Sequence, residues 1–137
     1  MNIADKYINT ILDEIMKHEG YSNPIQVSDL MSIVPLEDRE IRSVVSYLVV
    51  EKYYPIGSTS SRPSGFFKIK NANDLIKAIK NLNPRSNKID KRTISLIKAC
   101  RKFNIPIPKI TLTKEIDSSR LVIHIKESVV FIKNGKD

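Results

Sequence analysis

The chain has 137 residues, a net charge of +8 and a hydrophobic fraction of 41%. These values predict one basic globular domain, or a small domain with an appendage. No stretch approaches the roughly 18 apolar residues of a membrane span, and acidic residues within the first apolar run argue against a targeting peptide, so we expect a cytoplasmic protein. One cysteine and two histidines exclude a disulfide framework and argue against a structural metal site.

The first expected helix covers residues 3–17, where apolar residues recur on one side. Gly20 is expected to end it, in the C-terminal position that glycine favours. Residues 21–27 form a connector with the alternation of a short strand. Ser28 is then expected to be the N-cap of a second helix over residues 29–34.

Residues 37–51 predict an amphipathic helix, because apolar residues recur at helical spacing and acidic residues stand in its first turn. The expected inward face comprises Ile41, Val44, Val45 and Leu48. Residues 54–56 are expected to be extended, since a proline disfavours the helical region for the residue before it. A loop rich in Ser, Thr, Pro and Gly over residues 58–64 then leads to a second strand over residues 66–70.

The order of helix, short strand, short helix, turn, amphipathic helix and hairpin resembles the winged helix-turn-helix family over residues 3–70. In that family an Arg-x-Ile-Arg-x-x-Ile-x-x-Leu helix is followed by Pro-Ile, a small-residue turn and Gly-Tyr-Tyr. Here residues 39–48 read REIRSVVSYL, Pro55-Ile56 follows, and residues 65–67 read Gly-Phe-Phe. The resemblance implies a non-enzymatic protein that binds double-stranded DNA in transcription control or replication initiation.

After the hairpin, residues 73–82 read NDLIKAIKNL and residues 85–92 read RSNKIDKR. This segment is similar to the helix after the wing in small winged-helix proteins of phages and other mobile elements, which carries a Glu-Leu-x-x-Ala-Ile-x-x-Leu-Arg-x-Arg stretch. Residues 73–103 are strongly helical and predict either one long basic helix bent at Pro84 or two helices in line. An apolar residue recurs every seven positions, and this stripe either packs on the core or forms a homodimer seam through residues 75–103. The stripe comprises Leu75, Leu82, Ile89, Leu96 and Phe103.

The last part of the chain changes character. Residues 104–108 carry two prolines and are expected to be a rigid linker, and residues 109–114, 120–126 and 129–132 are expected to be strands of a small β-element. This element is expected to dock on the domain or pair with a second copy. The expected fold is therefore α+β, with a winged helix-turn-helix domain (1–70), a basic helical extension (71–103) and a C-terminal β-element (104–137).

The positive charge is concentrated in one part of the sequence. Residues 1–57 contain five Lys and Arg against nine Asp and Glu, whereas residues 58–103 contain twelve against two. Such a distribution favours a polyanionic partner over an incidentally basic surface. The expected DNA-binding residues are Arg39, Arg42, Ser43, Ser46 and Tyr47 of the helix, Arg62, Lys68 and Lys70 of the wing, and Arg85, Lys88 and Arg92 of the extension.

Arg39 or Arg42 is expected to bind a guanine edge, which would contribute about 1–3 kcal/mol of discrimination. The neighbouring acids weaken this helix as a phosphate-facing surface, so the wing with Arg62 is expected to supply more of the affinity. These acids are Glu37, Asp38 and Glu40.

No pattern indicates catalysis, because the histidines stand apart and there is no phosphate-binding glycine-rich loop, so we expect no cofactor, metal or small-molecule ligand. The alternative is a winged helix that serves protein interaction or oligomerisation, with the acidic helix 37–51 meeting the partner. A weaker alternative is a binder of RNA or single strands, which the few aromatic residues among the basic ones argue against.

Overall fold

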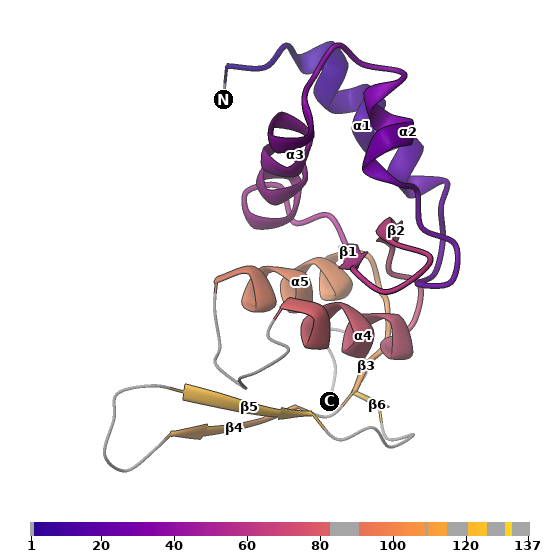
Figure 1. The fold of residues 1–137 in the computed structure, drawn as a ribbon. Helices are drawn as coiled ribbons and strands as arrows, with labels where there is room; N and C mark the ends of the chain where they lie inside the picture. The colour runs from indigo at the N-terminus through magenta and orange to yellow at the C-terminus, as the bar shows by residue number, and fades with distance from the viewer. Residues whose placement is uncertain (1, 83–90, 109, 115–120, 126–130, 133–137) are drawn as a thin grey trace.

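The computed structural model describes residues 2–82, 91–108, 110–114, 121–125 and 131–132, with side chains described up to Ile107. It is an α+β structure with several helices and a two-stranded antiparallel hairpin. Figure 1 shows helices α1 (Asp5–Met16), α2 (Val27–Met31) and α3 (Asp38–Val50) at one end of the molecule, and the hairpin lies between them and two further helices.

Helix α1 buries one face, as its spacing predicts, through Ile8, Ile11 and Ile15. The expected role of Gly20 is wrong, because the helix ends at Met16 and Gly20 lies four residues later. Gly20 takes a φ of 91°, which glycine adopts without strain, and its N–H donates to the carbonyl of Lys68 at 2.9 Å. This glycine therefore joins the connector to the hairpin.

The start of helix α2 also differs from expectation. Ile25 pairs in antiparallel fashion with Phe66, with two backbone hydrogen bonds of 2.8 and 2.9 Å between them. The chain is therefore extended up to Gln26, which is the N-cap at ψ 152°, and the helix begins at Val27. Ser28 lies inside the helix and is not its N-cap.

Helix α3 buries the four predicted residues and also Val49. Its N-cap is Glu37, and a reciprocal capping box joins Glu37 to Glu40, whose carboxylate accepts the Glu37 N–H at 3.0 Å. The acids in the first turn therefore satisfy backbone groups that a helix start leaves without partners.

Strands β1 (Ile56–Thr59) and β2 (Gly65–Lys68) form the expected antiparallel hairpin, with Ile56 opposite Lys68 and Thr59 opposite Gly65. Gly65 has a φ of 139°, and a Cβ there would lie 2.1 Å from the carbonyl oxygen of Ile25. The close pairing of β2 with the connector before α2 therefore requires glycine at this position.

The expectation of one long helix, or of two helices in line, is wrong. Helices α4 (Ala72–Leu82) and α5 (Lys91–Lys102) are separate and contact each other, which two helices in line could not do along their length (Figure 1). Helix α4 also contacts β1, and α5 contacts α3.

One hydrophobic core runs through residues on both sides of position 70. Leu75 and Leu96 of the seven-residue stripe are buried in the same cluster as the inward faces of α1 and α3, and Leu82 and Phe103 pack against it. Within residues 2–82 and 91–107, the stripe thus contributes to the chain's own core; Ile89 and Pro84 lie outside the described residues. Ile105 and Ile107, expected in a linker, are buried in the core instead.

The C-terminal strands pair in two short ladders. Strand β3 (Ile107–Pro108) pairs with β6 (Phe131–Ile132), and β4 (Ile110–Lys114) pairs with β5 (Leu121–Ile125), both in antiparallel fashion. The expected turn between β4 and β5 lies outside the described residues.

Candidate functional site

The outward face of α3 carries three of the predicted site residues. Arg39 and Ser43 are exposed and Ser46 is half-buried, opposite the buried stripe of the helix. Spaced at about 100° per residue, these three positions fall close together on the helix surface. The sequence pattern therefore places them correctly on the solvent side.

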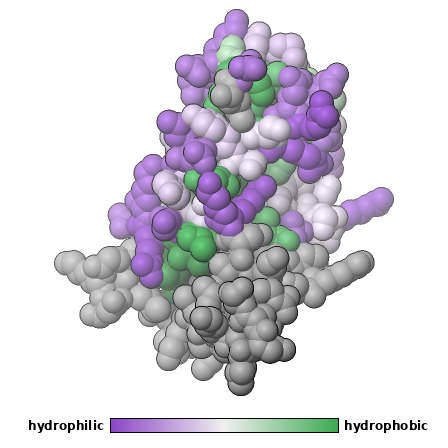
Figure 2. Space-filling view, turned by 90° about the vertical axis from the view of Figure 1, so that its left-hand side faces the viewer, coloured by the Kyte–Doolittle hydropathy of each residue, from purple (hydrophilic) through white to green (hydrophobic). Residues whose placement is uncertain are grey.

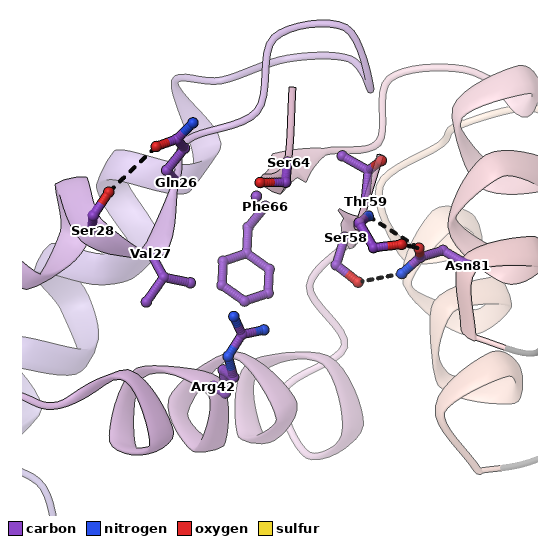
Figure 3. Close-up of a pocket in the computed structure, with 11 residues that line it drawn as sticks. Gln26, Val27, Ser28, Arg42, Ser58, Thr59, Ser64, Phe66 and Asn81 are labelled. Atoms are coloured by element: carbon purple, nitrogen blue, oxygen red, sulfur yellow. Dashed lines mark hydrogen bonds between the residues drawn. The ribbon is translucent and has the colours of Figure 1, made fainter. Parts of the chain in front are cut away.

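Arg42 occupies the flank of α3 that faces the hairpin. Its guanidinium carbon lies 5.9 Å from the centre of the Phe66 ring, and its Nε donates to the Asp38 carboxylate one turn earlier. Figure 3 shows the side chain rising from α3 toward the ring of Phe66. A cation over an aromatic face is attracted to it, so Arg42 connects the polar side of α3 with strand β2.

Tyr47 lies at the edge of this group of residues. It follows Ser43 by four positions, which is about 40° around the helix axis. Its ring is half-buried against the core, with the Lys52 ammonium 5.8 Å from the ring centre. Part of the Tyr47 side chain thus stays accessible, and its contact with DNA stays a prediction.

A polar groove of about 450 Å³ separates α3 from the hairpin loop (residues 60–64). Arg42 and Phe66 form its floor in Figure 3, and residues at the start of α2 and the end of α4 close its sides. No sequence pattern pointed to Gln26 or Asn81 as parts of this groove. Its lining residues are Gln26, Val27, Ser28, Arg42, Ser58, Thr59, Ser60, Ser64, Gly65, Phe66 and Asn81.

Asn81 holds the hairpin loop against α4. Its Oδ1 accepts hydrogen bonds from the backbone N–H of Ser60 at 3.2 Å and from the Ser60 hydroxyl at 3.0 Å. Its Nδ2 donates to the Ser58 hydroxyl at 3.1 Å (Figure 3). The loop is thereby positioned by a helix that follows it in the chain.

The predicted basic residues of the hairpin lie in different surroundings. Arg62 is exposed in the loop, whereas Lys68 is half-buried at the far end of β2 with its ammonium 3.5 Å from the Glu19 carboxylate. Lys70 is exposed beyond β2, close to Gly20. Of these three predicted basic residues, Arg62 is therefore the one that lies in the hairpin loop.

Much of the charge on α5 serves contacts within the chain. Lys102 donates to the backbone carbonyl of Lys52 at 3.1 Å, just beyond the C-terminus of α3. Lys91 lies 3.8 Å from the Glu51 carboxylate, and the Lys98 ammonium lies 5.8 Å from the centre of the Tyr53 ring. Among the predicted site residues, Arg92 is half-buried on this helix; Arg85 and Lys88 lie outside the described residues.

The surface around α3 mixes hydrophilic residues with small hydrophobic patches, as the side view in Figure 2 shows. Arg39 stands in the sequence between the acids Asp38 and Glu40 of the first turn. Glu37 and Glu40 belong to the capping box, and Asp38 binds Arg42, so each of these acids has a structural partner close to it. The start of α3 nevertheless keeps a negative balance, which opposes contact with phosphates.

The described residues offer no arrangement suited to metal binding, since no three His, Cys, Asp or Glu side chains among them come together. The Cys100 thiol is buried, and burial, with the Asp74 carboxylate adding to the effect, raises its pKa to about 12. Such a thiol stays protonated at neutral pH and is a poor nucleophile. In the part of the chain that the structure describes, no helix is long and apolar enough to cross a membrane.

Comparisons with protein-family models, with curated proteins and with solved structures gave no match.

Proposed function

We propose that this chain is a winged helix-turn-helix protein that binds double-stranded DNA with the exposed face of α3 and the hairpin loop. The observation that carries the proposal is the position of Arg42 over Phe66, because it brings the polar side of α3 and the hairpin to the two sides of one groove. The order α1, paired Ile25, α2, α3, β1, β2 is similar to that of the family and supports the proposal.

In this proposal α3 enters the major groove. Arg39 is exposed and binds a base edge, where a bidentate contact to guanine contributes about 1–3 kcal/mol of discrimination. Ser43 and Ser46 lie beside it and donate to phosphate or base atoms. Arg42 keeps its contacts with Asp38 and Phe66, and it lines the groove into which the DNA backbone fits.

The hairpin loop supplies the second contact. Arg62 is exposed at its tip and binds phosphates or the edge of the minor groove, as basic arms beside recognition helices do. Because Asn81 already fixes Ser60, less conformational freedom is lost when the loop meets DNA. The negative charge at the start of α3 then weakens non-specific binding to phosphates. The loop and its basic neighbours supply the affinity for DNA.

The biological setting that we propose is transcription control or replication initiation in a phage or mobile element. It rests on the sequence resemblance of the segment after the hairpin.

The test is the binding of a labelled random-sequence duplex at several salt concentrations, followed by fluorescence anisotropy. Arg62→Ala should weaken binding to all sequences and lower the salt slope by about one unit, as expected when one phosphate contact is lost. Lys6→Ala is the matched control, since Lys6 is an exposed cation on α1 beside Tyr7. If Arg62→Ala and Lys6→Ala behave alike, the loop is not a DNA contact.

A second candidate function is a protein-interaction or oligomerisation module. Met31, the last residue of α2, is 43% exposed, and Ile33, in the segment that leads to the acids Glu37 and Asp38, is 46% exposed. A partner with apolar and basic residues would suit this surface, and Ile94, 43% exposed on α5, offers a contact for a second copy. This candidate predicts self-association in sedimentation velocity that Ile94→Ser or Met31→Ser with Ile33→Ser abolishes, together with no salt-sensitive DNA binding.

A further inference from the structure

A second groove, of about 390 Å³, lies between the hairpin loop, the connector after α1 and helix α4. Three cations from two parts of the chain line it, together with hydroxyl and amide groups, and no acidic residue is among its lining residues. Its members are Tyr21, Ser22, Thr59, Ser61, Arg62, Pro63, Lys77, Lys80 and Asn81.

The cations of this groove are gathered by the fold. Lys77 and Lys80 are three residues apart on α4 and therefore share one face of the helix. Arg62 reaches the same groove from the hairpin loop, which Asn81 binds to the end of α4. Like charges repel one another, so such a convergence favours an anion between them.

Contacts with α4 also hold Tyr21, which lines this groove, in position. The Lys77 ammonium lies 5.0 Å from the centre of the Tyr21 ring, which positions both side chains. The backbone N–H of Tyr21 donates to the Asp74 carboxylate at 3.2 Å, and the N–H of Lys70 donates to its other oxygen at 3.0 Å. Asp74 is only 1% exposed and already binds these two N–H donors, so its charge is not presented to the groove.

We propose that this cationic groove, defined by Arg62, Lys77 and Lys80, binds a stretch of DNA phosphate backbone separate from the stretch that α3 contacts. Thr59 and Asn81 line both grooves, so the hairpin loop stands between two adjoining binding surfaces. The inference rests on the proposed function and extends it, because helix α4 then belongs to the DNA interface.

The phosphates of a nucleic acid strand suit this groove better than a single free anion. Its cations come from separate elements, and the groove shares the lining residues Thr59 and Asn81 with the neighbouring one. A strand backbone presents successive phosphates at fixed spacing, which a row of separated cations can contact together. Hydroxyls of Ser22 and Ser61 can donate to the same backbone.

The test compares Lys77→Ala with Lys80→Ala, made together, against the matched pair Lys6→Ala with Lys17→Ala on α1. Both pairs remove two positive charges from exposed positions. Salt-dependent binding to a random-sequence duplex is measured for the full chain and for both double variants, with circular dichroism and thermal midpoints recorded for each. The α4 pair should lower the salt slope by about two units, since each phosphate contact contributes about 0.9 units, while the α1 pair leaves it near the wild-type value.

The double variant Lys77→Arg with Lys80→Arg should bind DNA as wild type does. This result would show that the two lysines act through their positive charge and not through folding. Equal slopes for the α4 and α1 pairs, with wild-type binding intact, would overturn the groove assignment and leave the proposed function standing. If wild type itself shows no salt-sensitive binding, the proposed function fails first. Inorganic phosphate at matched ionic strength is the remaining probe: strong competition that needs Lys77 and Lys80 would assign the groove to small anions instead.

Discussion

The side-chain amide of Asn81, in the last turn of α4, accepts two hydrogen bonds from Ser60 in the hairpin loop, at 3.0 and 3.2 Å. The same amide donates to Ser58 on strand β1. The loop that carries Arg62 is therefore held by a residue 21 positions later in the chain. This relationship makes α4 a support for the proposed DNA-binding surface as well as part of it.

Asn81→Ala should lower DNA affinity more than it lowers stability. The lost hydrogen bonds are partly accessible to water, so the free energy of unfolding should fall by only about 0.5–1.5 kcal/mol. The loop must then be ordered upon binding, at a further cost of about 0.5–1.5 kcal/mol per immobilised side chain. Urea unfolding and anisotropy titrations measure the two effects. Asn73→Ala, an exposed position on α4, is the control, and equal DNA affinity for the two variants would contradict the role of Asn81.

Glu40→Gln should tighten DNA binding. The amide oxygen can still accept the Glu37 N–H that the carboxylate accepts now, so the capping box is kept while one negative charge is removed from the proposed interface. Exposed charges a few Å apart interact by about 1 kcal/mol in water, so affinity should rise up to about fivefold at low salt and less at high salt. Asp13→Asn makes the same charge change on α1 and should have a smaller effect. If both variants gain equally, α3 does not face DNA.

Asp74→Ala should destabilise the fold. The carboxylate is buried and binds the N–H groups of Tyr21 and Lys70 in two part-buried hydrogen bonds, so its removal takes the acceptor from both donors. We expect a loss of about 2–4 kcal/mol in the free energy of unfolding, and a smaller loss for Asp74→Asn, which keeps an acceptor oxygen. Urea denaturation checks this, with Asp13→Ala on α1 as an exposed control. A loss for Asp74→Ala no larger than for the control would show that the connector is held by other contacts.

Because the Cys100 thiol is buried, we expect the protein to lose stability at alkaline pH. Burial, with a smaller effect from the Asp74 carboxylate, raises its pKa from 9.0 to about 12. Between these values the unfolded chain binds fewer protons than the folded one, so the free energy of unfolding falls as pH rises. The contribution of the thiol to the free energy of unfolding is complete below pH 9.0 and is lost toward pH 12.

Urea midpoints of wild type and Cys100→Ala across this range measure the effect, because the two proteins differ only at this side chain. Wild type should lose stability more steeply than the variant. Parallel curves would mean that the thiol already meets solvent in the folded protein.

The helices α1 and α3 and the hairpin follow from local patterns. Ile41, Val44 and Leu48 recur at helical spacing, and the loop is marked by its Ser, Thr, Pro and Gly content. The start of α2 could not be located in this way, because it depends on the pairing of Ile25 with Phe66, which keeps the chain extended up to Gln26. Tertiary pairing overrode the capping preference of serine at this position.

The site was predictable only in part for the same reason. Arg39 and Ser43 are exposed because the opposite face of α3 is apolar, and that pattern is local. The pairing of Lys68 with Glu19 and the bonds of Asn81 to Ser60 join residues 49 and 21 positions apart, which no local spacing indicates. The sequence pattern did not indicate that α4 and α5 are separate helices, because the seven-residue spacing of apolar residues continues across both.

The central claim is that the exposed face of α3 and the hairpin loop bind duplex DNA. The most direct measurement is the equilibrium binding of wild-type protein to a random-sequence duplex over a series of salt concentrations. If these surfaces bind DNA, log K falls linearly with log salt, with a slope of about −0.9 for each phosphate contacted. Binding that is absent at low salt, or that does not change with salt, would contradict it.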